Sequence, residues 1–385
     1  MKRKWLTIGI ILLFVGVTIA PAIAQETEKT QSTSRGNWLY VGGSGPGNYT
    51  KIQDAIDNAS EGDTVFVYDD SSPYPEKLII DKSIVLNGED QDTTVLAGVD
   101  GAITINITAE SVYISGFTIK QITSGLFGVA IHADSVWIES NRFISENPEP
   151  HTTKNGIFAQ NVNNLTIINN EFKEIVTAIR IKKSNSSMIK NNNFTGGWIA
   201  IDIDRCYKTI ITNNWINDSG ACISLDGGSH SIISNNTINL GKVTGEWWRL
   251  LHINVSSEFG ICLSESDSIV TDNLINDCEK GIVTDRAVSC YIARNQITQC
   301  YCGLDNLYTQ QCIFIDNDFK QNVLKQISDT CFLNRYIHNY WGRPRLLPKP
   351  LINVLPLPIG PGVDPGFIFI PIPTLDFRPA LFPNN

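Results

Sequence analysis

Positive charge is scarce in this chain. Lys and Arg number 30 against 39 Asp and Glu, for a formal net charge of −9, and only 18% of the residues are charged. A nucleic-acid partner needs basic side chains opposite its phosphates, so this balance argues against one. The sequence also lacks Cys-x-x-Cys spacing of the zinc-binding type. After residue 20 no apolar run is long enough to span a bilayer.

The N-terminus has the three parts of a secretory signal. Basic residues 2–4 precede an apolar run over 5–20, and Ala22-Ile23-Ala24 resembles a small-x-small cleavage site. We expect residues 1–24 to be a signal peptide, with an uncleaved membrane anchor as the alternative, and 25–37 to be a flexible leader. Either way, the rest should be extracellular or at the cell surface, and would meet a membrane only through this segment. The mature chain would carry a charge of about −12, because three basic residues are lost.

A short helix is predicted ahead of the first strands. Tyr49, Ile52, Ala55, Ile56 and Ala59 recur at helical spacing, and a glycine follows at position 62. We expect this apolar face to cover an open end of the fold. From residue 64 the pattern changes to short strands separated by Gly, Asn and Asp, at 64–67, 78–80, 84–86 and 103–105.

Asparagine then recurs in the motif apolar-x-x-Asn-x-apolar, and six of the eight intervals are 22 residues long. We call these residues the asparagine ladder: Asn141, Asn170, Asn192, Asn214, Asn236, Asn273, Asn295, Asn317 and Asn339. The residues three places before and two places after each one are apolar. Asparagine suits a bend because it tolerates left-handed backbone geometry, and stacked asparagines can hydrogen-bond along a column. A fixed register over 200 residues indicates a repeat architecture.

The period of 22 matches one turn of a three-sided coil, in which each residue lies about 4.8 Å from its counterpart in the next turn. A second column confirms the register, because a small residue and an aliphatic follow eight places after the ladder, as in Ala178-Ile179, Ala200-Ile201 and Gly281-Ile282. The sequence therefore predicts an all-β, single-stranded right-handed parallel β-helix over 38–342, of about 11–12 turns.

Two intervals of the ladder are longer than 22, by 7 residues between Asn141 and Asn170 and by 15 between Asn236 and Asn273. Both insertions fall in the bend before the small-aliphatic strand, so both should project from one edge of the coil. Residues 343–385 are rich in proline, which cannot continue a ladder of strands. We expect this tail to pack as an irregular extended cap over the last turn, with a disordered tail as the alternative.

Three stretches resemble a known family: residues 40–56 with their glycine-rich turn, the nine-fold asparagine repeat, and Asn339-Tyr340-Trp341-Gly342-Arg343-Pro344. They are similar to the pectin-lyase-like β-helix superfamily, and within it to exported archaeal proteins of the NosD type, also described as CASH (carbohydrate-binding and sugar hydrolysis) domains. The resemblance covers about residues 38–380. It is specific for fold and says little of activity, because the superfamily includes lyases, hydrolases, epimerases and scaffolds.

One set of polar residues should share the outer face of the small-aliphatic strands. Because residues alternate between inside and outside, Asp202 and Asp204 should point outward together, beside Arg180 and Lys182 one turn earlier and Asp226 one turn later. Asp285 and Asp305 continue the same columns. The longer insertion adds Trp247, Trp248 and Arg249 at the rim. These residues predict a groove with carboxylates at its floor and aromatic rings at its edge.

Such a groove suits a polysaccharide or a surface glycan, and the first hypothesis is an exported glycan-binding or structural scaffold. The alternative is a polysaccharide lyase or glycoside hydrolase, with two carboxylates as acid and base or with Asp202, Asp204 and Asp226 holding calcium. No catalytic set is complete. Arg180-Ile181-Lys182 comes too early for a polygalacturonase-like pattern, and Gly228-Ser229-His230 is not Gly-His-Gly. A merely solvated, charged outer face explains the same residues.

Copper is disfavoured as a cofactor, although the NosD resemblance raises it, because Met188 is the one methionine after the first residue and the five histidines share no register. The nine cysteines include two pairs separated by 22 residues, Cys278 with Cys300 and Cys290 with Cys312. Each pair should stack one strand spacing apart, within reach of a disulfide. Stacked thiols that pack as small apolar side chains are the equal alternative.

Overall fold

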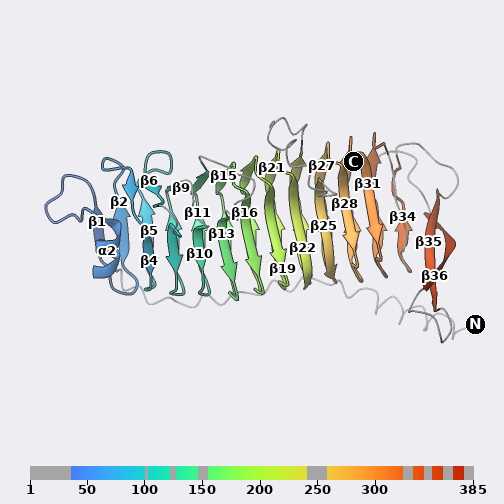
Figure 1. The fold of residues 1–385 in the computed structure, drawn as a ribbon, viewed down its shortest axis with the longest axis horizontal. Helices are drawn as coiled ribbons and strands as arrows, with labels where there is room; N and C mark the ends of the chain where they lie inside the picture. Colours follow the sequence, from blue (N-terminus) through green and yellow to red (C-terminus); the bar gives the residue numbers. More distant parts are fainter. Residues whose placement is uncertain are drawn as a thin grey trace, which may run out of the picture. The chain divides into compact units, whose positions relative to one another are not determined.

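The structure is a computed structural model that describes residues 36–99, 103–121, 127–145, 155–240, 258–323, 333–341, 349–358 and 367–376. Among the described residues, three parallel sheets form the coil, and successive strands along the chain pass from sheet to sheet (Figure 1). From β2 to β30, each strand pairs with the strand three further along the chain, because one turn contributes one strand to each sheet. The predicted parallel β-helix, with about 12 turns, is confirmed.

Sheet A begins with the N-terminal strand and runs the length of the coil. Its strands, in order, are β1 (Trp38–Val41), β2 (Thr64–Val67), β5 (Val85–Gly88), β8 (Tyr113–Ser115), β11 (Trp137–Glu139), β14 (Thr166–Ile168), β17 (Met188–Lys190), β20 (Ile210–Thr212), β23 (Ile232–Ser234), β26 (Ile269–Thr271), β29 (Tyr291–Ala293), β32 (Ile313–Ile315) and β34 (Arg335–Ile337). The predicted strand at 64–67 is confirmed, whereas β5 begins one residue later than the expected start at 84.

Sheet B follows sheet A around each turn, and the ladder asparagines stand at the bend between the two. Its strands are β3 (Tyr74–Pro75), β6 (Val95–Ala97), β9 (Thr118–Gln121), β12 (Arg142–Ser145), β15 (Glu171–Lys173), β18 (Asn193–Thr195), β21 (Trp215–Asn217), β24 (Thr237–Asn239), β27 (Leu274–Asn276), β30 (Gln296–Thr298) and β33 (Asp318–Lys320).

Sheet C contains the small-aliphatic strands. They are β4 (Leu78–Ile80), β7 (Ile105–Ile107), β10 (Phe127–Ile131), β13 (Asn155–Gln160), β16 (Thr177–Lys182), β19 (Ile199–Asp204), β22 (Ala221–Ser229), β25 (Phe259–Ser266), β28 (Lys280–Asp285) and β31 (Cys302–Leu307). The expected strand at 103–105 begins two residues later, as β7. Most of both insertions, 146–154 and 241–257, lies outside the described residues, but each connects a sheet B strand to a sheet C strand, as predicted.

The predicted helix is α2 (Ile52–Asn58), in which Ile52, Ala55 and Ile56 are buried in the core. It lies at the blue end of the coil in Figure 1, against the first strands. Because its apolar face is the one that is buried, the helical spacing in the sequence was correctly interpreted. No helix in the described part of the chain is long and apolar enough to cross a bilayer, and the N-terminal apolar run lies outside that part.

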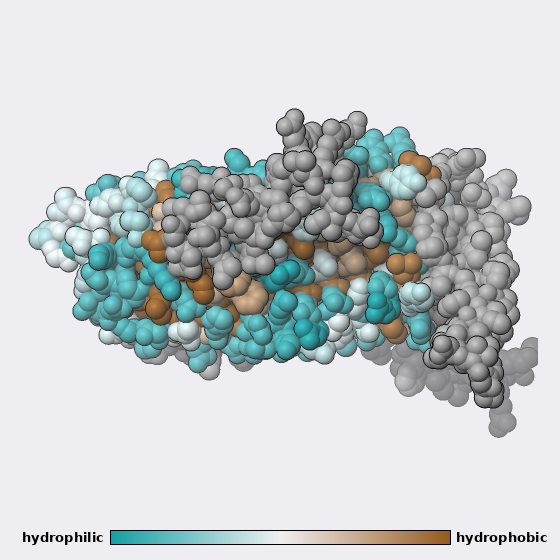
Figure 2. Space-filling model, viewed as in Figure 1, coloured by the Kyte–Doolittle hydropathy of each residue, from teal (hydrophilic) through white to brown (hydrophobic). Residues whose placement is uncertain are grey.

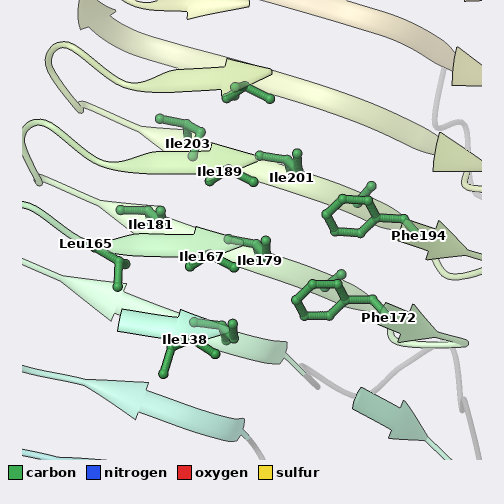
Figure 3. Packing of buried hydrophobic residues seen from close by; sticks show 14 of the residues in the cluster. Ile138, Leu165, Ile167, Phe172, Ile179, Ile181, Ile189, Phe194, Ile201 and Ile203 are labelled. Atoms are coloured by element: carbon green, nitrogen blue, oxygen red, sulfur yellow. The ribbon is translucent and has the colours of Figure 1, made fainter. Parts of the chain in front are cut away.

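Apolar side chains fill the coil in columns. Phe143, Phe172 and Phe194 stack with centroids 4.7 and 4.9 Å apart and rings within 9° of parallel. Figure 3 shows Phe172 and Phe194 one above the other, with isoleucines from neighbouring strands pointing into the same interior. A column forms because parallel strands in register place each residue about 4.8 Å from its counterpart. The apolar residues that flank each ladder asparagine are buried, as the motif predicts.

The asparagine ladder is a continuous hydrogen-bonded column inside the coil. Each asparagine donates its backbone N–H and its Nδ2 to the Oδ1 of the next one, at 2.9–3.3 Å. All nine are buried. These bonds satisfy amides that would otherwise be costly to bury. The stacking predicted from the 22-residue period is therefore confirmed.

The left-handed backbone expected at the ladder asparagine is found one residue earlier. The residue directly before each ladder asparagine has a φ of 52° to 59°. These residues are Ser140, Asn169, Asn191, Asn213, Asn235, Asp272, Arg294, Asp316 and His338. The left-handed residue makes the bend and points its side chain outward, so the following asparagine enters the interior with its amide free to join the column. Our assignment of the bend to the ladder asparagine itself was wrong by one position.

The proline-rich tail forms a separate pair of strands. β35 (Lys349–Pro358) and β36 (Phe367–Asp376) pair antiparallel, apart from the three sheets of the coil. Regular pairing differs from the irregular extended chain that we expected. It is possible because prolines alternate with residues that keep their N–H groups. The tail's role as a cap stays a prediction.

Candidate functional site

The predicted polar residues lie together on the outer face of sheet C. Along β16, Ile179 and Ile181 are fully buried, so Arg180 and Lys182 between and after them face outward. Register places Asp202 beside Arg180, and Asp204 beside Lys182. Asp226 follows Asp204 in the next turn. Asp305 lies further along the column of register partners that contains Asp202. The members of this column, one from each successive turn, are Ala130, Phe158, Arg180, Asp202, Ser224, Cys262, Val283 and Asp305.

The carboxylates at the centre of this face are paired with cations. Arg180 Nε lies 2.6 Å from Asp202 Oδ2, and Lys182 Nζ lies 3.5 Å from Asp204 Oδ2. Arg205 adds a two-pronged contact to Asp204, from Nε at 2.8 Å and from the guanidinium Nη2 at 3.0 Å. Sequence reasoning missed Arg205 because it follows the end of β19, at a left-handed residue, where strand alternation no longer predicts direction.

Ion pairing fixes the protonation state of Asp204. The hydrogen bond from Arg205 lowers the pKa of this carboxyl, and it outweighs partial burial, which acts in the opposite direction. Asp204 is thus a carboxylate at any ordinary pH. A general acid needs a pKa near the working pH, so Asp204 is badly placed for that role and well placed to accept hydrogen bonds.

Further along the same face the pairing continues. Asp305 is buried and lies 2.8 Å from Lys280 Nζ. Burial alone would lower the pKa of Lys280, but the hydrogen bond and charge of Asp305 raise it overall. Asp285 contacts Arg286 at 3.4 Å. Asp226, by contrast, is exposed.

Apolar side chains share this face with the charged pairs. Phe127 and Phe158 stack on neighbouring strands, with centroids 4.8 Å apart and rings 25° from parallel. Figure 2 shows hydrophobic residues in a band above a hydrophilic lower margin. The sequence did not reveal this pair, because the two residues are not counterparts in the register. Phe127 lies beside Asn155, and Phe158 lies beside Ala130. Trp247, Trp248 and Arg249, expected at the rim, lie outside the described residues.

A cavity of about 720 Å³ lies elsewhere, at the bend between sheets A and B. Its lining residues are Asp272, Asn273, Leu274, Arg294, Asn295, Gln296, Asp316, Asp318 and His338. Arg294 holds Asp272 through two contacts of 2.7 and 2.8 Å, which lower the pKa of Asp272. His338 Nδ1 lies 2.6 Å from Asp316. None of the residues predicted for the sheet C face lines this cavity.

The family of the chain follows from comparisons with known proteins. The model of the family "Right handed beta helix region" matches residues 97–249 and 155–339, which together exceed half of the chain. The chain belongs to the right-handed beta helix family. No curated protein matches it in sequence.

Solved structures share the fold of this right-handed beta helix at low identity. A mannuronic acid specific polysaccharide family 6 lyase from human gut microbiota is 16% identical, with a TM-score of 0.50 over 75% of this chain and 84% of that one. An alginate lyase from Paenibacillus sp. is also 16% identical, with a TM-score of 0.48 over 68% and 95%. The likeness to the polysaccharide family 6 lyase shows a shared fold alone. The narrower NosD-type, archaeal resemblance stays a prediction.

Metal ligands do not gather in the described part of this beta helix. No group of three or more His, Cys, Asp or Glu side chains there could hold a metal ion. Asp202, Asp204 and Asp226, which we considered for calcium, therefore do not form such a cluster.

The four cysteines expected to stack do so at two corners of the coil. The Cys290 N–H donates to Cys312 Sγ at 3.2 Å, and the two thiols also hydrogen-bond to each other. Cys278 and Cys300 are buried free thiols, and each donates to the carbonyl two residues before it. The structure contains them as thiols, so a disulfide in either pair stays a prediction.

One buried carboxyl was not foreseen. Glu265 is 2% exposed at the inner corner between sheets C and A, beside a bulge at Gly227 and Gly228. A Cβ at Gly228 would lie 2.5 Å from Glu265 Oε1, so the glycine makes room for the carboxyl. Burial raises the pKa of Glu265 to about 7, against the hydrogen bond from Ser268 Oγ at 2.9 Å, which lowers it.

Proposed function

We propose that this right-handed beta helix is an exported protein that binds a polysaccharide along the outer face of sheet C without cleaving it. The observation that carries the proposal is the paired state of the central carboxylates, Asp202 with Arg180 and Asp204 with Lys182 and Arg205. Paired charges keep hydrogen-bonding atoms at fixed positions on a flat surface. Such a surface can orient the hydroxyl groups of a sugar chain that lies across the strands.

Aromatic side chains supply the other half of sugar recognition. Phe127 and Phe158 offer neighbouring rings on the same outer face as the ion pairs. Ligand sites typically combine apolar walls with a few fixed polar groups, and this face contains both. Export is supported by the signal-like segment at residues 1–24.

The alternative is a lyase or hydrolase that uses the same carboxylates. Hydrolysis of a glycosidic bond by two carboxylates needs one of them protonated at the working pH. The pKa of Asp204 is lowered by its guanidinium partner, which works against that requirement. Binding therefore accounts for the geometry better than cleavage does.

The test uses the mature chain and a panel of acidic and neutral polysaccharides, with binding measured by affinity electrophoresis and cleavage by new reducing ends and unsaturated-product absorbance. We expect retardation by at least one polysaccharide and no product. The double variant Asp202→Ala/Asp204→Ala should weaken binding about tenfold, as expected when hydrogen bonds to charged groups are lost.

A matched control comes from another face. Arg142 Nε lies 2.7 Å from Glu171 Oε2 on the outer face of sheet B, with side-chain exposure similar to that of the Arg180 pair. Glu171→Ala should leave binding unchanged. A product that the Asp202→Ala/Asp204→Ala variant no longer forms would establish the enzyme instead, and absence of binding across the panel would refute the proposal.

A further inference from the structure

Four aromatic side chains cluster at the N-terminal end of sheet A. We call Trp38, Tyr40, Phe66 and Tyr68 the aromatic platform. Ring centroids lie 6.1 Å apart between Trp38 and Tyr40 and 6.0 Å between Tyr40 and Tyr68, with rings 29° and 23° from parallel. Phe66 packs edge-on against Tyr68 at 5.1 Å. The rings thus form one connected surface rather than isolated side chains.

The platform faces away from the core. Val41, Val65 and Val67 on the same strands are fully buried, so the alternate residues project outward. Trp38 is 55% exposed and Tyr40 is 38% exposed. They stand on β1, the edge strand of sheet A, at the blue end of the coil in Figure 1. Mutual ring contacts offset only part of the cost of exposing this apolar surface. Exposed patches of this kind commonly mark binding sites.

Acidic groups border the platform. Tyr68 and Asp70 both adjoin Gly43, because the Gly43 N–H donates to Asp70 Oδ1 at 2.9 Å and a Cβ at Gly43 would lie 2.8 Å from the Tyr68 ring. Asp69 follows Tyr68 directly, and its backbone N–H donates to Glu89 at 3.1 Å. Asp70 is exposed. The described residues 36–99 contain eleven acidic and three basic side chains. This end of the coil is therefore strongly negative.

We propose that the aromatic platform is a binding site for a sugar chain that carries free amines. The flat face of a pyranose ring, with its C–H groups, can stack on Trp38 and Tyr40. An ammonium group is attracted both to the faces of aromatic rings and to the carboxylates at the border. The same charges repel uronate chains and anionic membrane surfaces. This site is separate from the sheet C face and goes beyond the function proposed for that face.

The test compares ligands first, because this comparison needs no variant. Isothermal titration of the mature chain with glucosamine oligosaccharides, which carry free amines, should give a Kd at least tenfold lower than with N-acetylglucosamine oligosaccharides of equal length. Oligouronates and vesicles of anionic phospholipid should not bind at this site. Added salt should weaken binding of the amine-bearing ligand, because its charge contribution is screened.

Variants locate the site. Trp38→Ala and Tyr40→Ala should each weaken binding of the glucosamine oligosaccharide about tenfold, and Asp70→Asn about threefold, with unchanged circular dichroism. The control is Trp215→Ala on sheet B, where the tryptophan is 47% exposed. Asp202→Ala/Asp204→Ala should also leave this affinity unchanged, which separates this site from the sheet C face. Equal affinity for acetylated sugars, binding that survives loss of Trp38, or capture by anionic vesicles that Trp38→Ala abolishes would each overturn the proposal.

Discussion

Asn192 donates both its backbone N–H and its Nδ2 to a single acceptor, Asn214 Oδ1, at 2.9 and 3.1 Å. Asn214 in turn donates to Asn236 Oδ1 and to the Ile189 carbonyl. One side chain therefore serves as acceptor for the turn before it and as donor for the turn after it. Asparagine suits this role because its side chain carries both a hydrogen-bond acceptor and a donor.

Asn214→Ala should destabilise the coil strongly. It leaves the buried backbone N–H of Asn192 without its acceptor and removes one of the three acceptors of Asn192 Nδ2. A buried unsatisfied group costs about 1–3 kcal/mol. We expect a fall of about 3 kcal/mol in the free energy of unfolding, measured by urea denaturation. The matched control is Asn213→Gly, at the left-handed position with φ of 56°, where glycine fits without strain. If both variants lost similar stability, the ladder would not carry the effect.

Glu265 should make stability depend on pH. Its pKa is raised by burial from about 4.5 to about 7, so the folded chain binds a proton more tightly than the unfolded chain does. The stabilisation is therefore complete below pH 4.5 and is lost as pH rises to 7. The loss is about 3 kcal/mol for this shift, since one pKa unit corresponds to about 1.4 kcal/mol. Thermal melts between pH 4.5 and 8 should show the decline, and Glu265→Gln should flatten it. A wild-type profile that the variant reproduces would contradict this assignment.

Oxidation should join the stacked cysteines. Refolding with a small-molecule disulfide as oxidant would convert each thiol pair to a disulfide. The S–S bond of the oxidant breaks, and the oxidant takes up two electrons and two protons and leaves as two thiols. Each crosslink closes a loop of about 22 residues and should add about 3 kcal/mol to the stability. Alkylation of the unfolded protein, followed by mass spectrometry, should leave Cys278, Cys300, Cys290 and Cys312 unlabelled and Cys206 labelled. Full labelling of all five would refute the crosslinks.

Phe172→Ala should cost more than Phe143→Ala, although both remove one phenyl ring. Phe172 stands between two stacked partners, whereas the described ring contacts of Phe143 include Phe172 alone. Removal of a buried phenylalanine typically costs about 3–5 kcal/mol, and each lost ring contact adds about 1 kcal/mol. Chemical denaturation of the two variants, with Phe172→Leu as a conservative control, measures the difference. An equal loss would mean that ring stacking adds nothing to burial.

Much of the fold and part of the candidate site could be predicted from the 22-residue period of the sequence. A fixed period places Asp202 beside Arg180 and Cys290 beside Cys312, because parallel strands translate each residue by one turn. The period does not predict the direction of a side chain where the backbone departs from a regular strand. Arg205 reaches Asp204 from a left-handed residue, and the bulge at Gly227 and Gly228 changes the register that brings Glu265 inside.

The role of residues before the first ladder asparagine is harder to predict from the sequence, because the repeat does not extend to them. Trp38 and Tyr40 lie in a strand that precedes the repeat, so no period links them to Phe66 and Tyr68. Their common surface depends on the pairing of β1 with β2, across the helix and turn that separate the two strands. The aromatic platform became visible only when that pairing was known.

The asparagine ladder also makes the length of the coil adjustable. Every step of the column repeats the same two hydrogen bonds. The bonds at one step are therefore independent of the number of turns on either side. Deleting residues 193–214 would bring Asn192 into contact with Asn236 through the same bonds, and duplicating them would insert another step. The chain can thus evolve as a spacer of selectable length, with the platform at one end kept at a chosen distance from whatever the other end adjoins.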